Sequence, residues 1–326
     1  MIRDLDTRAV IKNAFRIVKQ KYQTSLRVRV PGGLIDPDSL LVISKIANEY
    51  GNGQIHITTR QGFEILGIDM ESMPEVNKMI QPVIDNMNTN QGKKNTGYDA
   101  AGTRNIAACI GNKVCPKAQY NTTKFAQRIE NAIFPHDLHF KIALTGCPND
   151  CIKARMHDFG IIGMCKPEYE MSRCVNCGAC VRKCKQMSVD ALSIENNKIV
   201  RNEEKCIGCG ECVLNCPMSA WTRSPKKYYR LAIMGRTGKK NPRLAQDWFK
   251  WIDEDSIVKI IQNTYKYVEE YISPDAPNRK EHIGYIVDRT GFKEYRKWAL
   301  EGVDLPLECV ETPNMYWHGP EYHKFG

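Results

Sequence analysis

The spacing of the cysteines constrains this chain more strongly than any other feature. The 326 residues include 14 cysteines, and all but Cys165 and Cys309 fall into short, regularly spaced groups. Such groups favour metal ligation, with disulfides in an exported chain as the alternative. The first residues carry acids and contain no apolar segment of the signal-peptide type. We therefore expect a metal-binding protein of a reducing compartment, the cytoplasm.

Eight of the cysteines form two copies of one pattern. The copies read Cys174-x2-Cys177-x2-Cys180-x3-Cys184 and Cys206-x2-Cys209-x2-Cys212-x3-Cys216-Pro217. Each run can place three thiolates around one [4Fe–4S] cluster, and its fourth cysteine binds the cluster of the other run. The predicted ligand sets are Cys174, Cys177, Cys180 and Cys216 for one cluster, and Cys206, Cys209, Cys212 and Cys184 for the other.

These two runs resemble the bacterial two-cluster ferredoxin domain, and the resemblance implies a role in electron transfer. Four-cysteine zinc sites are the alternative for such ligand sets. The sequence departs from the ferredoxin pattern after Cys184, where Lys185 stands in place of a proline. A positive charge at this point is expected to raise the potential of the nearby cluster.

A third set of four cysteines has a different spacing. Cys109 and Cys115 are separated by five residues, and Cys147 and Cys151 by three. Four thiolates suit one more [4Fe–4S] cluster. Because the spacing is not that of a ferredoxin, we expect this cluster to lie in a different setting.

The charge balance points to an anionic partner. The formal net charge is +10, which favours acidic proteins, nucleic acids or anionic small molecules. The basic residues are scattered and form no recognisable nucleic-acid-binding module, so nucleic acid is not the expected partner. No apolar run is long enough for a membrane span. An anionic cofactor or substrate is the expectation.

The apolar periodicity predicts an α+β chain. Helices are predicted over 9–20, 39–50 (capped by Asp38), 115–134, 244–272 and 279–301, and extended segments over 26–30, 55–59, 63–68, 138–144 and 231–234. The expected units are an N-terminal helix with a half-domain at 1–84, the first part of a cluster domain at 85–165, a ferredoxin insert at 166–225 and the remainder of the cluster domain at 226–326.

Several stretches resemble the family of sirohaem-dependent sulfite and nitrite reductases. They are Val28-Arg29-Val30-Pro31-Gly32-Gly33, Ile57-Thr58-Thr59-Arg60-Gln61-Gly62-Phe63, Gly102-Thr103-Arg104-Asn105 and the motifs from Cys109 to Cys151. The resemblance implies a sirohaem domain with a ferredoxin-like half-domain, into which the two-cluster ferredoxin domain is inserted. It also implies that Cys151 bridges the third cluster and the iron of the sirohaem.

Sirohaem carries eight carboxylates, so its pocket needs cations and N–H donors. The candidate cations are Arg27, Arg29, Lys113, Arg236, Lys239 and Lys240, and residues 235–238 could form a backbone anion nest. The resemblance adds polar and glycine contacts from Thr59, Thr103, Asn105, Asn149, Thr237 and Gly238. For each cation taken alone, a solvated surface charge is the alternative.

Sulfite is a small dianion, and its reduction to sulfide takes six electrons and six protons. In the family, two arginines and two lysines bind the anion and deliver protons. Arg60 and Arg104 match the arginines, and Lys141 matches one lysine. His139 stands where the other lysine is expected. Alternation along a strand places residues 139 and 141 on one face, so His139 could still donate protons.

The predicted function is therefore the six-electron reduction of sulfite at a sirohaem, with electrons relayed by the two ferredoxin-type clusters. A sirohaem nitrite reductase and a sirohaem-free electron-transfer protein are the alternatives. No flavin or nicotinamide motif is evident, so iron–sulfur and flavin reductase subunits are expected as electron donors. The family's reductases pair two half-domains and this chain has one, which predicts a homodimer or a larger hetero-oligomer.

Overall fold

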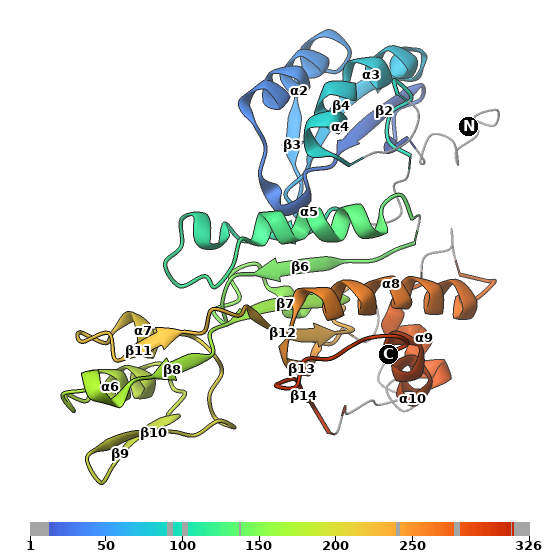
Figure 1. Ribbon diagram of the computed structural model, residues 1–326. Helices are drawn as coiled ribbons and strands as arrows, with labels where there is room; N and C mark the ends of the chain where they lie inside the picture. Colours follow the sequence, from blue (N-terminus) through green and yellow to red (C-terminus); the bar gives the residue numbers. More distant parts are fainter. Residues whose placement is uncertain are drawn as a thin grey trace.

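A computed structural model describes residues 13–89, 94–99, 104–136, 138–238, 242–276, 281–313 and 315. Its centre is a six-stranded sheet in the order β14-β13-β12-β7-β6-β5 (Figure 1). The strands are β5 (Ala107–Ala108), β6 (Ile142–Thr145), β7 (Phe159–Met164), β12 (Tyr228–Ile233), β13 (Gln246–Ile252) and β14 (Val310–Glu311). Strands β5, β6 and β7 run parallel, and the other neighbours are antiparallel.

Helices cover this sheet and bury its middle strands. They are α5 (Thr122–Ile133), α8 (Glu254–Tyr271), α9 (Ile283–Thr290) and α10 (Phe292–Ala299). Every residue of β6 and β7 is buried, as expected of parallel strands covered on both faces. The resulting core holds the loops that carry Cys109, Cys147 and Lys141 in fixed places. None of the described helices is long and apolar enough to cross a membrane.

The N-terminal half-domain has its own sheet and core, and lies at the top of Figure 1. Its sheet has the order β1-β2-β4-β3, made of β1 (Phe15–Ile17), β2 (Gln23–Val28), β3 (Ile55–Ile57) and β4 (Phe63–Asp69). Its helices are α2 (Pro37–Glu49), α3 (Met73–Met79) and α4 (Gln81–Met87). Because side chains alternate along β2, Arg27 lies on the face opposite to the buried Leu26 and Val28.

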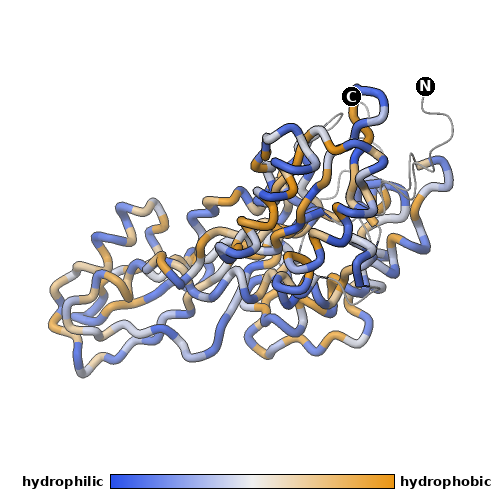
Figure 2. Tube along the Cα trace, turned by 90° about the horizontal axis from the view of Figure 1, so that it is seen from above, coloured by the Kyte–Doolittle hydropathy of each residue, from blue (hydrophilic) through white to orange (hydrophobic). Residues whose placement is uncertain are grey.

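A lobe projects from the central sheet between the neighbouring strands β7 and β12 (Figure 1). Its neck is an antiparallel pair of β8 (Pro167–Tyr169) and β11 (Trp221–Arg223). Beyond the neck lie α6 (Ala179–Gln186), the hairpin of β9 (Leu192–Glu195) and β10 (Lys198–Arg201), and α7 (Glu211–Leu214). Figure 2 shows the same lobe from above, extending to the left of the main body. The segment that holds the eight ferredoxin-type cysteines is thus a separate projection.

Two details of the predicted half-domain need correction. The helix predicted over 9–20 is wrong for its described part, because Phe15–Ile17 form β1 and pair with β2. Phe15 and Ile17 fit an alternating pattern as well as a helical one, and the free edge of β2 decides between them. Helix α2 confirms the helix over 39–50, but its cap is Asp36, whose carboxylate accepts the Ser39 N–H at 2.8 Å.

The helix predicted over 244–272 is wrong in its first part. Residues 246–252 form β13, and α8 begins only after Asp253, whose carboxylate accepts the Ser256 N–H at 2.8 Å. A short apolar run is ambiguous between strand and helix, and pairing with β12 decides in favour of strand. The helix predicted from residue 115 begins at Thr122, and the strand predicted from 138 begins at Ile142. The helices predicted over 279–301 are confirmed as α9 and α10.

Candidate active site

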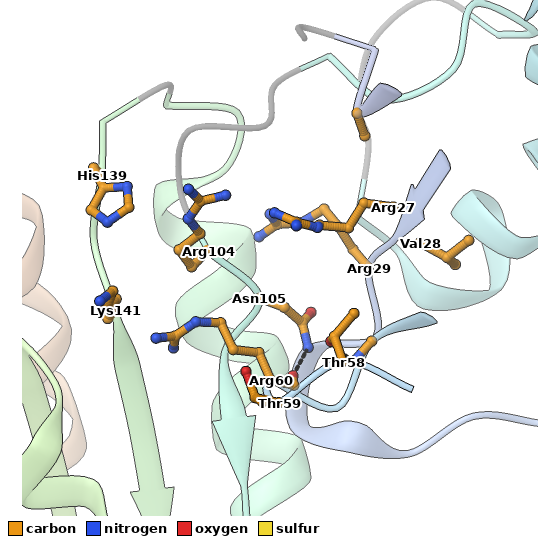
Figure 3. A pocket seen from close by; sticks show the side chains of 12 residues that line it. Arg27, Val28, Arg29, Thr58, Thr59, Arg60, Arg104, Asn105, His139 and Lys141 are labelled. Atoms are coloured by element: carbon orange, nitrogen blue, oxygen red, sulfur yellow. Dashed lines mark hydrogen bonds between the residues drawn. The ribbon is translucent and has the colours of Figure 1, made fainter. Parts of the chain in front are cut away.

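A cavity of about 310 Å³ lies between the half-domain and the central sheet (Figure 3). The four side chains predicted to act on the substrate all line it, namely Arg60, Arg104, His139 and Lys141. Three of the predicted cofactor residues line it as well, namely Arg29, Thr59 and Asn105. Arg27, a candidate cation of the sequence, points into the same space (Figure 3). The fold therefore gathers residues from four distant stretches of the chain around one basic cavity.

Backbone hydrogen bonds hold the segments that carry the predicted catalytic side chains. Arg60 lies at the tip of the β3–β4 hairpin, where the N–H of Thr58 binds the carbonyl of Gly62 at 2.8 Å. The N–H of Arg104 donates to the carbonyl of Phe140 at 3.1 Å, which ties the arginine segment to the segment of His139 and Lys141. The N–H of Lys141 in turn donates to the buried carboxylate of Asp158 at 3.0 Å.

The cavity is electrostatically unbalanced. Glu64 is bound by Arg16 and Ser25, and Glu130 is bound by Arg29 at 2.6 Å. Within the part of the chain that the structure describes, neither Arg60 nor Arg104 forms an ion pair. The Nη1 of Arg60 and the Nε of Arg27 are buried without a hydrogen-bond partner among the described residues. Buried donors without partners are costly, so the cavity is built to receive hydrogen-bond acceptors.

The pKa values of these cations reflect the same imbalance. Burial and the charges of the neighbouring arginines lower the pKa of Arg104 to about 10. Burial also lowers the pKa of Arg60, an effect that Asp158 partly offsets. The pKa of Lys141 is lowered mainly by burial, and Arg60 and Arg104 add to the effect. A bound anion would relieve these penalties.

Two residues predicted as cofactor contacts are held by protein partners. The guanidinium of Arg29 binds the carboxylate of Glu130, and both side chains are almost fully buried. The side-chain amide of Asn105 binds the backbone of Val30 and of Arg60, with the bond to the Arg60 carbonyl at 2.6 Å. Asn105 thus joins the half-domain to β5, and a role of either residue toward a cofactor stays a prediction.

The eight cysteines of the lobe line two separate cavities. One is lined by Cys174, Cys177, Cys180 and Cys216, and the other by Cys184, Cys206, Cys209 and Cys212. This division is the one predicted from the ferredoxin spacing. Among the described residues, no three His, Cys, Asp or Glu side chains converge closely enough for a single metal ion. Each cavity thus brings together the four thiols of one predicted ligand set.

Backbone donors point at several of the cysteine sulfurs. The N–H groups of Ala191 and Ala220 lie 3.2 Å from the Sγ atoms of Cys184 and Cys216, respectively. Burial tends to raise the pKa of Cys216, but the N–H groups from Met218 to Trp221 outweigh it and lower the pKa. Burial raises the pKa of Cys212, the opposite direction. Donors of this kind favour thiolate sulfur, the form in which cysteine binds iron.

The third set of cysteines lies at the ends of β5 and β6, on a partly open surface. The N–H of Gly146 lies 3.1 Å from the Sγ of Cys109, and a side chain at position 146 would collide with Ala118. Cys151 is exposed, whereas Cys147 is buried. Exposed apolar side chains lie near the four cysteines in the sequence, with Ile110 after Cys109, Val114 before Cys115 and Met156 five residues after Cys151.

The neck places one cysteine set of the lobe against this third set. The loop at 206–212 packs on Cys165, whose N–H donates to the Gly208 carbonyl at 2.8 Å. The carboxylate of Glu211 binds the Nζ of Lys117 at 2.6 Å, two residues after Cys115. Of the two lobe cavities, the one with Cys206, Cys209 and Cys212 is therefore the inner one.

The other predicted cofactor residues lie away from the basic cavity. Lys113 and Asn149 are exposed near the third cysteine set. Arg236 is buried beside Asp288, at 3.4 Å, and under the ring of Tyr285. Thr237 and Gly238 are exposed beside it. Thr103, Lys239 and Lys240 fall outside the described residues.

Sequence reasoning missed two residues behind the cavity wall. Asp158 precedes β7 and is buried, and its carboxylate binds the Nδ1 of His282 at 3.2 Å. His282 lies just before α9, and its ring meets that of His139 with the ring centroids 5.1 Å apart. Neither residue belongs to a recognisable motif, and only the tertiary contacts reveal them.

Comparison with known proteins divides the chain into a half-domain and a cluster domain. Residues 99–306 match the nitrite and sulphite reductase 4Fe-4S domain, and residues 16–83 match the nitrite/sulfite reductase ferredoxin-like half domain. Over 320 residues the chain is 39% identical to one of the subunits of the anaerobic sulfite reductase of Salmonella typhimurium, covering 96% of this chain and 94% of that protein.

More distant relatives share parts of the sequence or the fold. The chain is 33% identical over 168 residues to the coenzyme F420-dependent sulfite reductase of Methanocaldococcus jannaschii, covering 51% of this chain and 26% of that protein. The crystal structure of dissimilatory sulfite reductase I has a TM-score of 0.63 at 18% identity, over 90% of this chain and 73% of that chain. The fold around the cavity is thus shared with this structure.

Proposed function

The chain belongs to the nitrite and sulphite reductase family, as a sulfite reductase with an iron–sulfur domain, and from this premise we propose its reaction, cofactors and electron path. The proposed reaction is the six-electron reduction of sulfite to sulfide. Sirohaem and three [4Fe–4S] clusters are the proposed cofactors. The observation that carries the proposal is the basic cavity, where Arg60 and Arg104 are half-buried without an ion-pair partner among the described residues.

The cavity side chains bind sulfite and hold its charge. Arg60 comes from the half-domain and Arg104 from the segment before β5. Lys141 comes from the segment before β6 (Figure 3). Positioned cations in a partly desolvated site stabilise charge that develops on the substrate oxygens. Lys141 and His139 carry protons that can be transferred to these oxygens, which leave as water.

The surface around Cys151 is the proposed place of the sirohaem. The third cluster would be held by Cys109, Cys115, Cys147 and Cys151, with Cys151 facing the macrocycle. Ile110, Val114 and Met156 would contact its apolar face, and Lys113 would bind its carboxylates. When bound, these groups supply an open iron site and the electrons of the reduction.

The lobe is the proposed path of the electrons. Cys174 and the exposed Cys177 would help to hold the outer cluster, which would accept electrons from a donor protein. Cys206, Cys209 and Cys212 would help to hold the inner cluster, close to the neck, where Glu211 binds Lys117 two residues after Cys115. Flavin and iron–sulfur subunits are the proposed donors, because the sequence of this chain has no flavin or nicotinamide motif.

We further infer that a second copy of the chain completes the active site. No cysteine is among the described residues that line the basic cavity, and Cys151 is exposed. A two-fold pair of chains would bring the cavity of one copy over the sirohaem of the other. Arg60, Arg104, His139 and Lys141 would then act in trans.

The reaction is tested on the chain purified without oxygen. An absorption spectrum should show tetrapyrrole bands, and iron and acid-labile sulfide should match three clusters and one sirohaem. Reduced methyl viologen should then drive sulfite to sulfide, with nitrite assayed alongside. Cluster absorbance without tetrapyrrole bands would leave an electron-transfer protein, and turnover of nitrite alone would make the enzyme a nitrite reductase.

Complementation tests the shared site. Arg60→Ala and Cys151→Ala chains, each inactive alone, are co-expressed with different affinity tags so that the mixed pair can be isolated. This pair should regain part of the wild-type turnover, because one of its two shared sites has both residues intact. A wild-type chain paired with a chain carrying both substitutions should be inactive, since each shared site then lacks one residue. Activity in the second pair but not in the first would overturn the inference.

A further inference from the structure

A buried carboxylate and two histidines form a chain of contacts behind the basic cavity. The Oδ1 of Asp158 lies 3.2 Å from the Nδ1 of His282. The ring of His282 meets the ring of His139 edge to face, with centroids 5.1 Å apart. His139 lines the basic cavity, and His282 is absent from the lining. The three side chains thus run from the interior of the fold into the cavity.

Asp158 orients both histidine positions at once. It is 1% exposed, and its second oxygen, Oδ2, accepts the N–H of Lys141 at 3.0 Å. The same carboxylate therefore holds His282 and the segment that carries His139 and Lys141. A carboxylate bound to Nδ1 fixes the tautomer of an imidazole and leaves Nε2 to exchange protons.

His282 connects this group to solvent. Its side chain is 23% exposed, while that of Asp158 is 1% exposed. With the ring centroids 5.1 Å apart, one water between the two imidazoles would complete a path for a proton. Protons can therefore enter at His282 without passing Arg60 and Arg104, whose positive charges repel them.

We propose that His282, positioned by Asp158, is a proton relay that recharges His139 during turnover. This inference rests on the proposed function, because reduction of sulfite removes three oxygens as water and takes six protons from the site. In each step His139 gives a proton to a substrate oxygen, His282 gives one to His139, and solvent water gives one to His282. No electron moves through the relay, and both imidazoles return to their starting form.

The charges around the relay come from several elements. They are Asp158 before β7, Lys141 before β6, Arg60 from the β3–β4 hairpin, Arg104 before β5 and Glu281 beside His282. Glu281 is bound by Arg289 at 2.8 Å and is thus not the partner of the relay. Asp158 is the acid that contacts the pair directly.

Substitution of His282 tests the relay in the purified enzyme. His282→Gln keeps a donor for Asp158 but cannot carry a proton, so viologen-driven sulfite turnover should fall about 10- to 100-fold. The pH profile of turnover should change, and imidazole added to His282→Ala should restore part of the activity. The matched control is His136→Gln, a histidine beside the carboxylate of Glu269 at 3.6 Å that does not line the cavity.

A second measurement does not depend on turnover. Deuterium exchange at the imidazole Cε1 position, followed by peptide mass spectrometry across pH, reports the protonation of each histidine. His282→Gln should shift the exchange midpoint of His139, because the ring that His139 contacts is replaced by a group that does not titrate. His136→Gln should leave that midpoint unchanged.

The two measurements separate the relay from the proposed function. Wild-type enzyme without sulfite turnover would contradict the proposed function, and coupled exchange of His139 and His282 would still support the relay. Normal turnover of His282→Gln with an unchanged His139 midpoint would overturn it. Reduced turnover without imidazole rescue and without coupled exchange would make His282 a structural residue and would equally overturn it.

Discussion

The basic cavity and the cysteine lobe solve opposite electrostatic problems. In the cavity, Arg60 and Arg104 are half-buried and form no ion pair among the described residues, and the pKa of Arg104 is lowered to about 10. In the lobe, burial raises the pKa of thiols such as Cys180 and Cys209, which favours their neutral form. The cavity thus gathers positive charge, whereas the lobe gathers thiols that burial keeps neutral.

The two regions also differ in how the chain builds them. The lobe takes its ligands from two short loops with fixed spacing, and its cavities are lined by local residues. The basic cavity collects side chains from four distant stretches and depends on backbone bonds such as that of Arg104 to Phe140. Substitutions in the cavity should therefore change substrate chemistry, and substitutions in the lobe should change electron delivery.

The largest effect is expected from the cavity. Arg60→Ala removes a half-buried cation that would bind the substrate, so sulfite turnover should fall about 10²- to 10³-fold with any electron donor. Tetrapyrrole and cluster absorbance should stay unchanged. Lys78→Ala, which breaks an exposed ion pair with Glu75 in the same half-domain, is the matched control. A donor-specific loss in Arg60→Ala would contradict the separation of roles.

A smaller effect is expected when the charge of Arg104 is removed. This change should increase the stability of the fold, whereas Arg60→Ala should decrease turnover. Because the folded-state pKa of Arg104 lies below 12.5, its charge destabilises the fold below about pH 10, and the penalty is relieved as pH rises from there toward 12.5. Arg104→Met should raise the free energy of unfolding at pH 7.5 by about 1–3 kcal/mol.

Thermal unfolding with and without sulfite measures both effects of Arg104, namely the lower stability of the unliganded fold and the binding of the anion. The unliganded Arg104→Met variant should unfold a few degrees above the wild type. Sulfite should raise the midpoint of the wild type, since it binds the folded state, and should have a weaker effect on the variant. An unliganded variant that unfolds below the wild type would show that Arg104 stabilises the fold.

The smallest effect is expected at the neck of the lobe. Glu211→Gln weakens the bond to Lys117, a contact worth about 1 kcal/mol or less because Lys117 is half exposed. Turnover with the donor subunits isolated with the chain should fall by up to about fivefold, while viologen-driven turnover stays unchanged. Lys226→Ala, at an exposed pair with Glu308, is the control. Equal losses with both donors would argue that the neck shapes the active site instead.

The lobe and the basic cavity also differ in how far they could be predicted from the sequence. The division of the eight lobe cysteines follows from spacing alone, and the two cavities have the predicted linings. Arg60, Arg104, His139 and Lys141 are identified by resemblance, and they meet in one cavity. Their roles stay predictions, because geometry brings them together without showing a substrate.

Other features required the tertiary structure. Phe15–Ile17 and Gln246–Ile252 carry apolar patterns that fit helix or strand, and only pairing with β2 and β12 decides between them. Asp158 and His282 lie 124 residues apart, so no local pattern relates them. Arg29 and Asn105 show the converse, because their protein partners Glu130 and Val30 could not be seen in the sequence.

The most direct test of the account compares two variants with two electron donors. Sulfite turnover is measured for Cys209→Ala, in the inner cavity of the lobe, and for Arg60→Ala, each with the donor subunits and with reduced methyl viologen. We predict that Cys209→Ala loses turnover with the donor subunits and keeps most of it with viologen, whereas Arg60→Ala loses both. Equal loss of both activities in Cys209→Ala, or full activity with the donor subunits, would contradict the proposed path of electrons through the lobe.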